Sequence, residues 1–188
     1  MEKIRFGIIG TNTIVDKVLA AAQLEPRFEL TAVYSRTQER ADFFAEKYSV
    51  KHTFTSLEEM AASPLIDAVY IASPNSYHAP QSILFMQHGK HVLCEKPLAS
   101  NATEVKAMIE ASQKHNVTLM EAMMPSLTPN FAAIKNNINK IGTIRRYFAS
   151  YCQYSSRYND FKEGIIQNAF KPELSNGALV DIGIYTIY

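Results

Sequence analysis

The sequence predicts an α/β protein with a Rossmann-type, doubly wound parallel sheet, followed by the beginning of a second, α+β domain. Short apolar segments typical of buried strands alternate with segments of helical periodicity through about the first 120 residues. This alternation is typical of β-α-β units, in which a helix connects two parallel strands. Beyond Glu121 the alternation ends, and Pro125 and Pro129 interrupt the chain. We therefore expect a first domain at residues 1–120 and a second segment at 121–188.

The expected elements of the first domain follow one another through short polar connections. Thr37 and Ser56 stand where helix N-caps are expected. Glu59 follows Ser56 at the capping-box spacing, in which the two side chains satisfy amide donors at the helix start. The expected strands are 4–9, 28–34, 67–72, 91–94 and 118–120, and the expected helices are 14–23, 38–47, a short helix from 56, 77–88 and 103–115.

The second segment contains fewer expected elements. A helix is expected at about 130–139, and residues 143–154 form a long strand candidate with Tyr147, Tyr151 and Tyr154 on one side of a sheet. Residues 178–188 have helical potential but end without a glycine cap or a polar tail. We therefore expect a chain that stops before its second domain is complete.

Composition and charge argue against several classes of partner. Lysine and arginine number 19 and aspartate and glutamate 18, so a formal charge of +1 gives no broad basic field for nucleic acid or an anionic membrane. The two cysteines, Cys94 and Cys152, lack the spacing of a disulfide framework or a zinc site, and no metal is expected. The sequence also lacks a recognisable signal peptide or membrane-spanning run. We expect a cytoplasmic protein.

A glycine-containing turn joins the first expected strand to the first expected helix. In such turns, amide groups at the helix start bind the pyrophosphate of a dinucleotide. Counted from Gly10, the G-x-G-x-x-G/A pattern has Asn12 at its second glycine, and asparagine tolerates a positive φ better than most residues. The same residues also fit an ordinary strand-to-helix turn, so this motif alone leaves both interpretations open. The candidate residues are Gly10, Thr11, Asn12, Thr13 and Ile14.

The residues after the second expected strand lack a carboxylate. A carboxylate there usually binds the ribose hydroxyls of NAD, whereas this chain has Ser35 and Arg36. A guanidinium forms charge-assisted hydrogen bonds with a 2'-phosphate, and Arg40 adds a second positive charge one turn into the next helix. The alternative interpretation is a solvated arginine in a loop. We expect NADP as the cofactor, with NAD as the second choice.

Three further segments carry a more specific pattern. Residues 89–99 contain Glu95-Lys96-Pro97, residues 71–78 contain Pro74-Asn75 followed by His78, and residues 177–185 contain Asp181 and Tyr185. In their order along the chain, 71–78, 89–99 and 177–185, they resemble the signature segments of the Gfo/Idh/MocA family of oxidoreductases, and the resemblance covers essentially the whole chain. It implies an NAD(P)-binding Rossmann domain at 1–120 and an incomplete start of a substrate and dimerisation domain at 121–188.

The resemblance also implies roles for individual residues. It makes Lys96 the catalytic or substrate-orienting lysine, Glu95 a contact to the nicotinamide ribose, and Pro97 a residue that follows a cis peptide. Asp181 and Tyr185, four residues apart, would share one face of a helix. Tyr185 replaces the usual histidine, as in the subset that contains dimeric dihydrodiol dehydrogenase and NADP-dependent sugar dehydrogenases. The residues implied near the nicotinamide are Ser73, Pro74, Asn75, His78, Glu95 and Lys96.

The implied reaction is hydride transfer between a nicotinamide and a sugar, polyol or cyclic alcohol. A hydroxyl proton must leave or return as the hydride moves, so a positioned acid or base is required. We expect Tyr185 to transfer the proton, Lys96 to polarise the substrate oxygen and Asp181 to orient these groups. The alternative is a truncated, non-catalytic nucleotide-binding or regulatory protein. The expected partners are a small-molecule substrate and, in a full-length protein, further copies of the chain.

Overall fold

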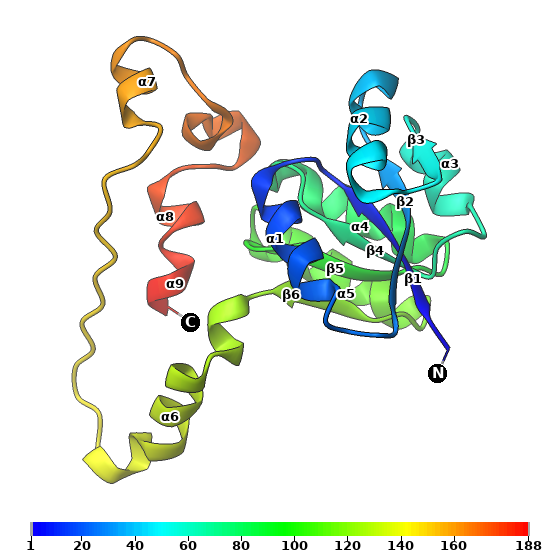
Figure 1. The fold of residues 1–188 in the computed structure, drawn as a ribbon. Helices are drawn as coiled ribbons and strands as arrows, with labels where there is room; N and C mark the ends of the chain where they lie inside the picture. Colours follow the sequence, from blue (N-terminus) through cyan, green and yellow to red (C-terminus); the bar gives the residue numbers. More distant parts are fainter. Residues whose placement is uncertain (1, 188) are drawn as a thin grey trace. The chain divides into compact units, whose positions relative to one another are not determined.

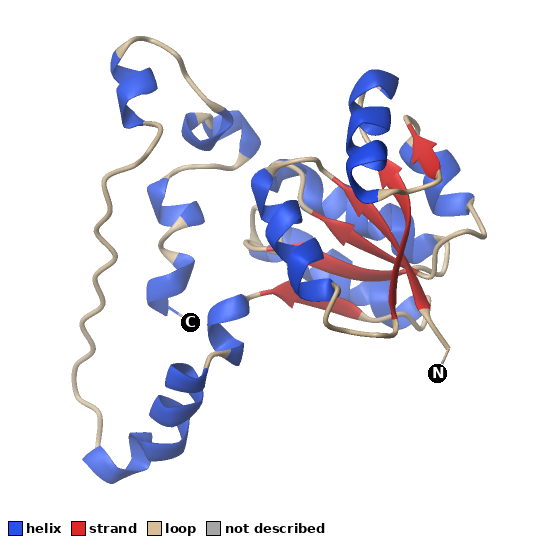
Figure 2. Ribbon diagram, in the orientation of Figure 1, coloured by secondary structure: helices blue, strands red, loops and turns tan. Residues whose placement is uncertain are grey.

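The structure is a computed structural model that describes residues 2–187, and the chain divides into two compact units after Glu121. Each unit is described by itself. The first unit contains a six-stranded sheet with helices on both faces (Figures 1 and 2). Helix α1 (Thr13–Ala22) lies on one face and helix α4 (His78–Gln87) on the other. This architecture confirms the expected α/β class.

The strand order of the sheet is β3-β2-β1-β4-β5-β6, and the pairs among β1 to β5 are parallel. The chain builds one half of the sheet outward from β1 and then begins the other half with β4 on the opposite side of β1. A crevice forms at the carboxyl ends of the strands where the order reverses in this way. The strands are β1 Ile4–Ile9, β2 Phe28–Tyr34, β3 His52–Phe54, β4 Ala68–Ile71, β5 His91–Glu95 and β6 Leu119–Ala122.

All five expected strands are present, and β3 is an additional strand that the sequence did not predict. It pairs with β2, with Thr53 opposite Val33. Three residues are too short a run for apolar alternation to be recognised. The two longest strands, β1 and β2, have the expected bounds.

Three of the five helices of the first unit, α1, α3 and α5, begin at a residue whose side chain caps the helix. The Ser56 hydroxyl accepts a hydrogen bond from the amide of Glu59 at 3.1 Å, which confirms the expected cap. Thr37 also occupies an N-cap position, but its side chain makes no capping hydrogen bond. The helices are α1 Thr13–Ala22, α2 Gln38–Tyr48, α3 Leu57–Ala62, α4 His78–Gln87 and α5 Ala102–Lys114.

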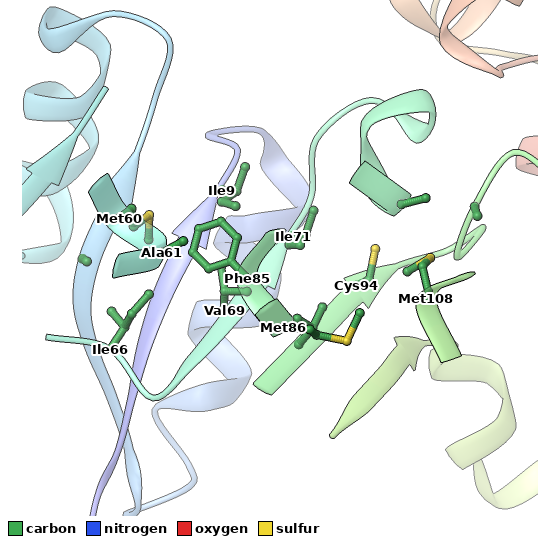
Figure 3. Close-up of a cluster of buried hydrophobic side chains, with 14 residues drawn as sticks. Ile9, Met60, Ala61, Ile66, Val69, Ile71, Phe85, Met86, Cys94 and Met108 are labelled. Carbon is green, nitrogen blue, oxygen red and sulfur yellow. The ribbon is translucent and has the colours of Figure 1, made fainter. Parts of the chain in front are cut away.

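One continuous apolar cluster, between the sheet and helices α3, α4 and α5, forms a large part of the core of the first unit (Figure 3). Ile8, Val15, Leu19 and Phe44 are buried outside this cluster. Phe85 and the three methionines Met60, Met86 and Met108 are fully buried within it. Methionine is flexible and fills irregular space between a sheet and its helices. Gly7 makes room for one of them, because a Cβ atom at that position would collide with the Cε atom of Met60.

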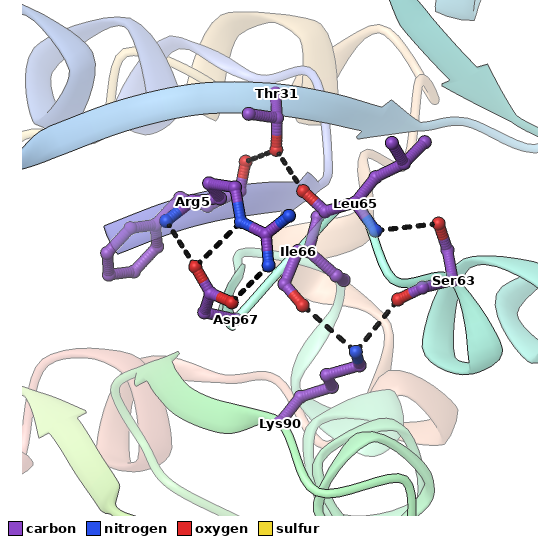
Figure 4. Close-up of polar contacts among 8 residues, drawn as sticks. Arg5, Thr31, Ser63, Leu65, Ile66, Asp67 and Lys90 are labelled. Carbon is purple, nitrogen blue, oxygen red and sulfur yellow. Dashed lines mark hydrogen bonds and ion pairs between the residues drawn. The ribbon is translucent and has the colours of Figure 1, made fainter. Parts of the chain in front are cut away.

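A polar cluster fixes the amino-terminal ends of β1, β4 and β5 (Figure 4). The Asp67 carboxylate accepts hydrogen bonds from the Arg5 guanidinium at 2.6 and 3.0 Å and from the Arg5 amide at 2.9 Å. The Lys90 ammonium donates to the carbonyl oxygens of Ser63 and Ile66 at 2.8 and 2.9 Å. These bonds fix the loop between α3 and β4, which leads into a central strand of the sheet.

The Arg5–Asp67 pair predicts part of the acid sensitivity of the fold. Hydrogen bonds from the Arg5 side chain lower the pKa of Asp67 below its ordinary value. Because the pKa of Asp67 is lower in the folded than in the unfolded chain, its carboxylate stabilises the fold at any pH above the unfolded-state pKa of about 3.9. This contribution is lost as the pH falls through the folded-state pKa. We expect Asp67→Asn to be less stable than wild type at neutral pH, with the difference shrinking toward about pH 3. Urea unfolding across this range measures it, and a difference that is constant with pH would contradict it.

The second unit contains short helices joined by extended segments. Within residues 2–187, no helix combines the length and apolar character needed to cross a membrane. The elements after β6 are η2 Met124–Leu127, α6 Pro129–Asn137, η3 Ile138–Ile141, α7 Tyr158–Lys162, η4 Asn168–Phe170, η5 Pro172–Leu174, α8 Ala178–Asp181 and α9 Ile184–Ile187. The helix expected at about 130–139 corresponds to α6 and η3.

The strand expected at residues 143–154 is wrong, because this segment has no regular secondary structure. A strand requires a partner for its backbone donors and acceptors, and residues 123–187 contain no strand that could supply one. Tyr147 and Tyr154 are consequently exposed rather than aligned on one side of a sheet. Tyr151 is also exposed and stacks on Tyr185, with 5.8 Å between the ring centroids.

The single helix expected to carry Asp181 and Tyr185 on one face is also wrong. Two four-residue helices, α8 and α9, are separated by Ile182 and Gly183. Glycine destabilises a helix interior by about 1 kcal/mol relative to alanine, and here it coincides with the break. Asp181 therefore ends one helix, while Tyr185 lies in the next.

Candidate dinucleotide-binding site

Strand register places the predicted cofactor-binding segments in one row at the carboxyl edge of the sheet. Ile9 of β1 pairs with both Tyr34 of β2 and Ile71 of β4, and Ile71 in turn pairs with Cys94 of β5. β1, β2 and β4 therefore end at the same level, and β5 continues one residue further, to Glu95. The next residues along the chain are Gly10, Ser35, Ala72 and Glu95, so the loops that follow them lie beside the position where the strand order reverses.

The turn after β1 brings the backbone of Gly10 against that of Ala72. Gly10 has φ +109°, and a Cβ atom there would lie 2.6 Å from the carbonyl oxygen of Ala72. Glycine is therefore required both for the conformation and for the close approach.

Asn12 caps helix α1 and ties it to the neighbouring strand. Its side-chain oxygen accepts from the amides of Ile14 and Val15 at 3.2 and 3.4 Å, and its side-chain nitrogen donates to Ala72 O at 2.9 Å. Its φ is −99°, so the tolerance of asparagine for a positive φ is not needed at this position. Asparagine occurs here because it caps a helix and reaches the next strand at once.

The structure brings Arg40 to the turn after β1. The Arg40 Nε atom donates to the Thr11 hydroxyl at 2.6 Å, and its Nη2 atom donates to the Thr11 carbonyl oxygen at 3.2 Å. Because the hydroxyl oxygen accepts this bond, its own hydrogen can be donated to a ligand. Arg36 is exposed at the end of β2, and Ser35 beside it is buried. Two guanidinium groups therefore lie on the segment that follows β2.

The loop after β4 is held from within by polar side chains. The Ser73 hydroxyl donates to the side-chain oxygen of Gln81 at 2.7 Å, and Asn75 is buried in the short helix η1 Asn75–Tyr77. Pro74 precedes this helix. His78 begins α4, and its ring is buried beneath the loop with 1% of its surface exposed.

The segment after β5 contains a cis peptide between Lys96 and Pro97, as the sequence resemblance implied. The Tyr70 hydroxyl donates to one carboxylate oxygen of Glu95 at 2.6 Å, and the Lys96 amide donates to the other at 3.2 Å. Burial and the hydrogen bond to Glu95 raise the pKa of Tyr70, which therefore remains a hydrogen-bond donor. Burial also raises the pKa of the neighbouring Cys94 thiol to about 12, which makes it a poor nucleophile.

Three side chains that contact these loops were not predicted from the sequence: Tyr70, Gln81 and Glu121. The Glu121 carboxylate accepts from the amide of Leu98 at 2.9 Å. A polar hydroxyl in the otherwise apolar run of β4 was the one available signal for Tyr70, since a buried tyrosine hydroxyl usually has a partner.

Asp181 and Tyr185 belong to the second unit, where Tyr185 contacts Tyr151. The other predicted residues, from Gly10 to Lys96, belong to the first unit.

Two hollows in the first unit share Ala22, Glu25 and Phe28, near the amino end of β2, and neither includes a residue of the carboxyl edge. Over residues 2–187, no three histidine, cysteine, aspartate or glutamate side chains gather where they could hold a metal.

The strand order and the glycine turn at the reversal point define a dinucleotide-binding α/β fold. Comparison with known families places residues 4–123 in GFO_IDH_MocA, described as "Oxidoreductase family, NAD-binding Rossmann fold". The chain belongs to this family, as the sequence resemblance indicated.

Relatives within the family include both characterised and structurally determined proteins. The chain is 59% identical over 185 residues to scyllo-inositol 2-dehydrogenase (NADP(+)) IolU of Bacillus subtilis, covering 98% of this chain and 56% of that protein. It is 34% identical over 190 residues to trans-1,2-dihydrobenzene-1,2-diol dehydrogenase of Danio rerio, covering 98% and 54%. The WlbA dehydrogenase of Bordetella pertussis, solved with NADH and UDP-GlcNAcA, superposes with a TM-score of 0.69 at 28% identity, covering 74% and 40%. The chain thus spans about half the length of the curated relatives it matches.

Proposed function

We propose that this chain binds NADP and forms the cofactor-binding part of an oxidoreductase acting on the CH–OH group of a sugar, polyol or cyclic alcohol. The observation that carries the proposal is the common level at which β1, β2 and β4 end, with Gly10, Ser35 and Ala72 next along the chain and Glu95 beside them as the last residue of β5. The names of the inositol and dihydrodiol dehydrogenases support the substrate class.

The residues of the turn after β1 fit the pyrophosphate of a dinucleotide. Gly10 leaves its side of the turn without a Cβ atom, while Thr11 and Thr13 add hydroxyl donors at the start of a ten-residue helix. The positive end of the helix dipole favours a phosphate there. We assign Gly10, Thr11, Asn12, Thr13 and Ile14 to this role.

The residues after β2 fit a 2'-phosphate on the adenosine ribose. Arg36 is exposed, and Arg40 is held at the glycine turn by Thr11. The first acidic residue after β2 is Glu39, inside helix α2 rather than at the strand end. The two guanidinium groups would attract a phosphate dianion, and Ser35 would be the neighbouring hydroxyl.

At the nicotinamide end, the loops after β4 and β5 would hold the ring and its ribose. Ser73, Pro74 and Asn75 would line one side, and Glu95 would accept from ribose hydroxyls. When bound, the dinucleotide supplies the hydride chemistry that no side chain can perform. The Lys96 ammonium would bind and polarise the substrate oxygen, which eases movement of the hydroxyl proton. We further propose Tyr185 as the group that exchanges this proton and Asp181 as the residue that orients it; both belong to the second unit.

Replacement of Arg36 by alanine tests the cofactor assignment. We expect NADPH affinity to fall about 10- to 100-fold, because a charge-assisted hydrogen bond contributes about 1.5–3 kcal/mol, while NADH affinity changes little. Isothermal titration calorimetry with both dinucleotides measures this. Arg27→Ala is the matched control, because that arginine pairs with Glu25 near the amino end of β2. Equal losses for the two dinucleotides would contradict the role of Arg36, and absence of NADPH binding by the wild-type chain would contradict the proposed function.

A further inference from the structure

His78 connects the two loops that flank the proposed nicotinamide site. Its Nε2 atom lies 2.9 Å from the carbonyl oxygen of Ser73, and its Nδ1 atom lies 2.8 Å from the carbonyl oxygen of Pro97. Ser73 follows β4 and Pro97 follows β5, so one ring spans the ends of adjacent strands. The ring donates to one or both oxygens, depending on which of its nitrogens carries hydrogen.

The contact to Pro97 fixes a particular peptide group. The carbonyl of Pro97 and the amide of Leu98 belong to the same planar unit. His78 contacts the oxygen of that unit, and the Glu121 carboxylate accepts from its N–H group at 2.9 Å. The peptide is therefore held at both ends by side chains from α4 and β6, which leaves it little freedom to rotate.

The residues on the other side of Lys96 are held as well. Tyr70 fixes the Glu95 carboxylate, which accepts from the Lys96 amide. The backbone of Lys96 thus lies between two anchored groups, one at Glu95 and one at the Pro97–Leu98 peptide. The anchor supplied by His78 is the one that also reaches the loop after β4.

We propose that His78 is a positioning residue that locks the Lys96–Pro97 segment to the Ser73 loop and so sets the geometry of the nicotinamide half of the site. This inference rests on the proposed function. With 1% of its surface exposed and both ring nitrogens beside backbone carbonyl oxygens, His78 acts beneath the ligand rather than on it. Its loss should loosen the nicotinamide half and spare the adenosine half, which is bound by the residues after β1 and β2.

Amide hydrogen exchange in the free chain is the first test. In His78→Leu we expect the amides of Lys96 and Leu98 to exchange about tenfold faster, while those of residues 10–15 keep the wild-type rate. His88→Leu is the matched control, because His88 follows the same helix and its Nδ1 atom also contacts a backbone carbonyl, that of Leu84, at 2.9 Å. His78→Gln keeps side-chain N–H donors and should restore part of the protection.

Ligand binding is the second test. For His78→Leu we expect a roughly tenfold loss of NADPH affinity together with a changed nicotinamide fluorescence, whereas adenosine 2',5'-bisphosphate binds within about twofold of wild type. Equal losses for the two ligands, or unchanged exchange at Lys96 and Leu98, would overturn the positioning role. If His78→Leu does not fold, the same two comparisons are made with His78→Gln. Failure of the wild-type chain to bind NADPH would refute the proposed function, while the exchange data would still decide whether His78 locks the loop.

Discussion

Alanine at position 10 is expected to abolish NADPH binding and to destabilise the first unit far more than alanine at position 89. Gly10 has φ +109°, and an added Cβ atom would lie 2.6 Å from the carbonyl oxygen and 3.0 Å from the carbonyl carbon of Ala72. The Ala72 backbone cannot retreat easily, because its amide donates to Ile9 O at 2.8 Å. The turn must therefore move, and with it the start of helix α1.

Gly89 is the matched control for this substitution. It also has a positive φ, +73°, but a Cβ atom there would meet nothing within 4 Å. Gly89→Ala should therefore cost only the backbone term, about 1–2 kcal/mol. Urea unfolding and NADPH titration of both variants measure the difference. Equal destabilisation, or wild-type affinity in Gly10→Ala, would show that the close approach at Ala72 is unimportant.

Lys96→Met is expected to lower kcat about 10²- to 10⁴-fold while leaving NADPH affinity within a few-fold of wild type. Methionine keeps much of the length of the side chain but removes the ammonium that would polarise the substrate oxygen. The assay uses NADP with scyllo-inositol, the substrate in the name of the Bacillus subtilis relative, and follows the absorbance of the reduced nicotinamide.

Lys90→Met is the control for Lys96→Met. Lys90 directly precedes β5, the strand that Lys96 follows, and donates to the carbonyl oxygens of Ser63 and Ile66. Its loss should lower stability and leave kcat unchanged. Wild-type turnover in Lys96→Met would refute the assigned role, whereas a loss of NADPH affinity as large as the loss of kcat would make Lys96 a cofactor-binding residue instead.

Local patterns were sufficient to predict most of the first unit. β1 and β2 begin and end as expected, because apolar runs bounded by polar residues are typical of buried parallel strands. The cap at Ser56 was predictable because a hydroxyl and the amide it binds are three residues apart. The segment 143–154 was mispredicted for the opposite reason. Its aromatic composition indicates a strand, but only a partner outside the segment can make it one.

The site was predictable where its residues directly follow strands. Because neighbouring parallel strands end close together, locating the ends of β1, β2 and β5 was enough to group Gly10 and Ser35, which follow β1 and β2, with Glu95, which ends β5. The contacts that hold these loops were not predictable. Tyr70 and Glu95 are 25 residues apart, and Leu98 and Glu121 are 23 apart. Such pairs become neighbours only through the sheet order, and no local pattern encodes them.

Because methionines line its core, the first unit's resistance to oxidants depends on how often the folded unit transiently opens. Met60, Met86 and Met108 are fully shielded, whereas Met120 is 53% exposed. Peroxide would oxidise Met120 directly and would reach the three shielded methionines only while the unit is opened, after which a polar sulfoxide would hinder reclosure. A bound dinucleotide lowers the opened fraction by mass action. The supply of cofactor would then govern how long the folded unit survives oxidative stress.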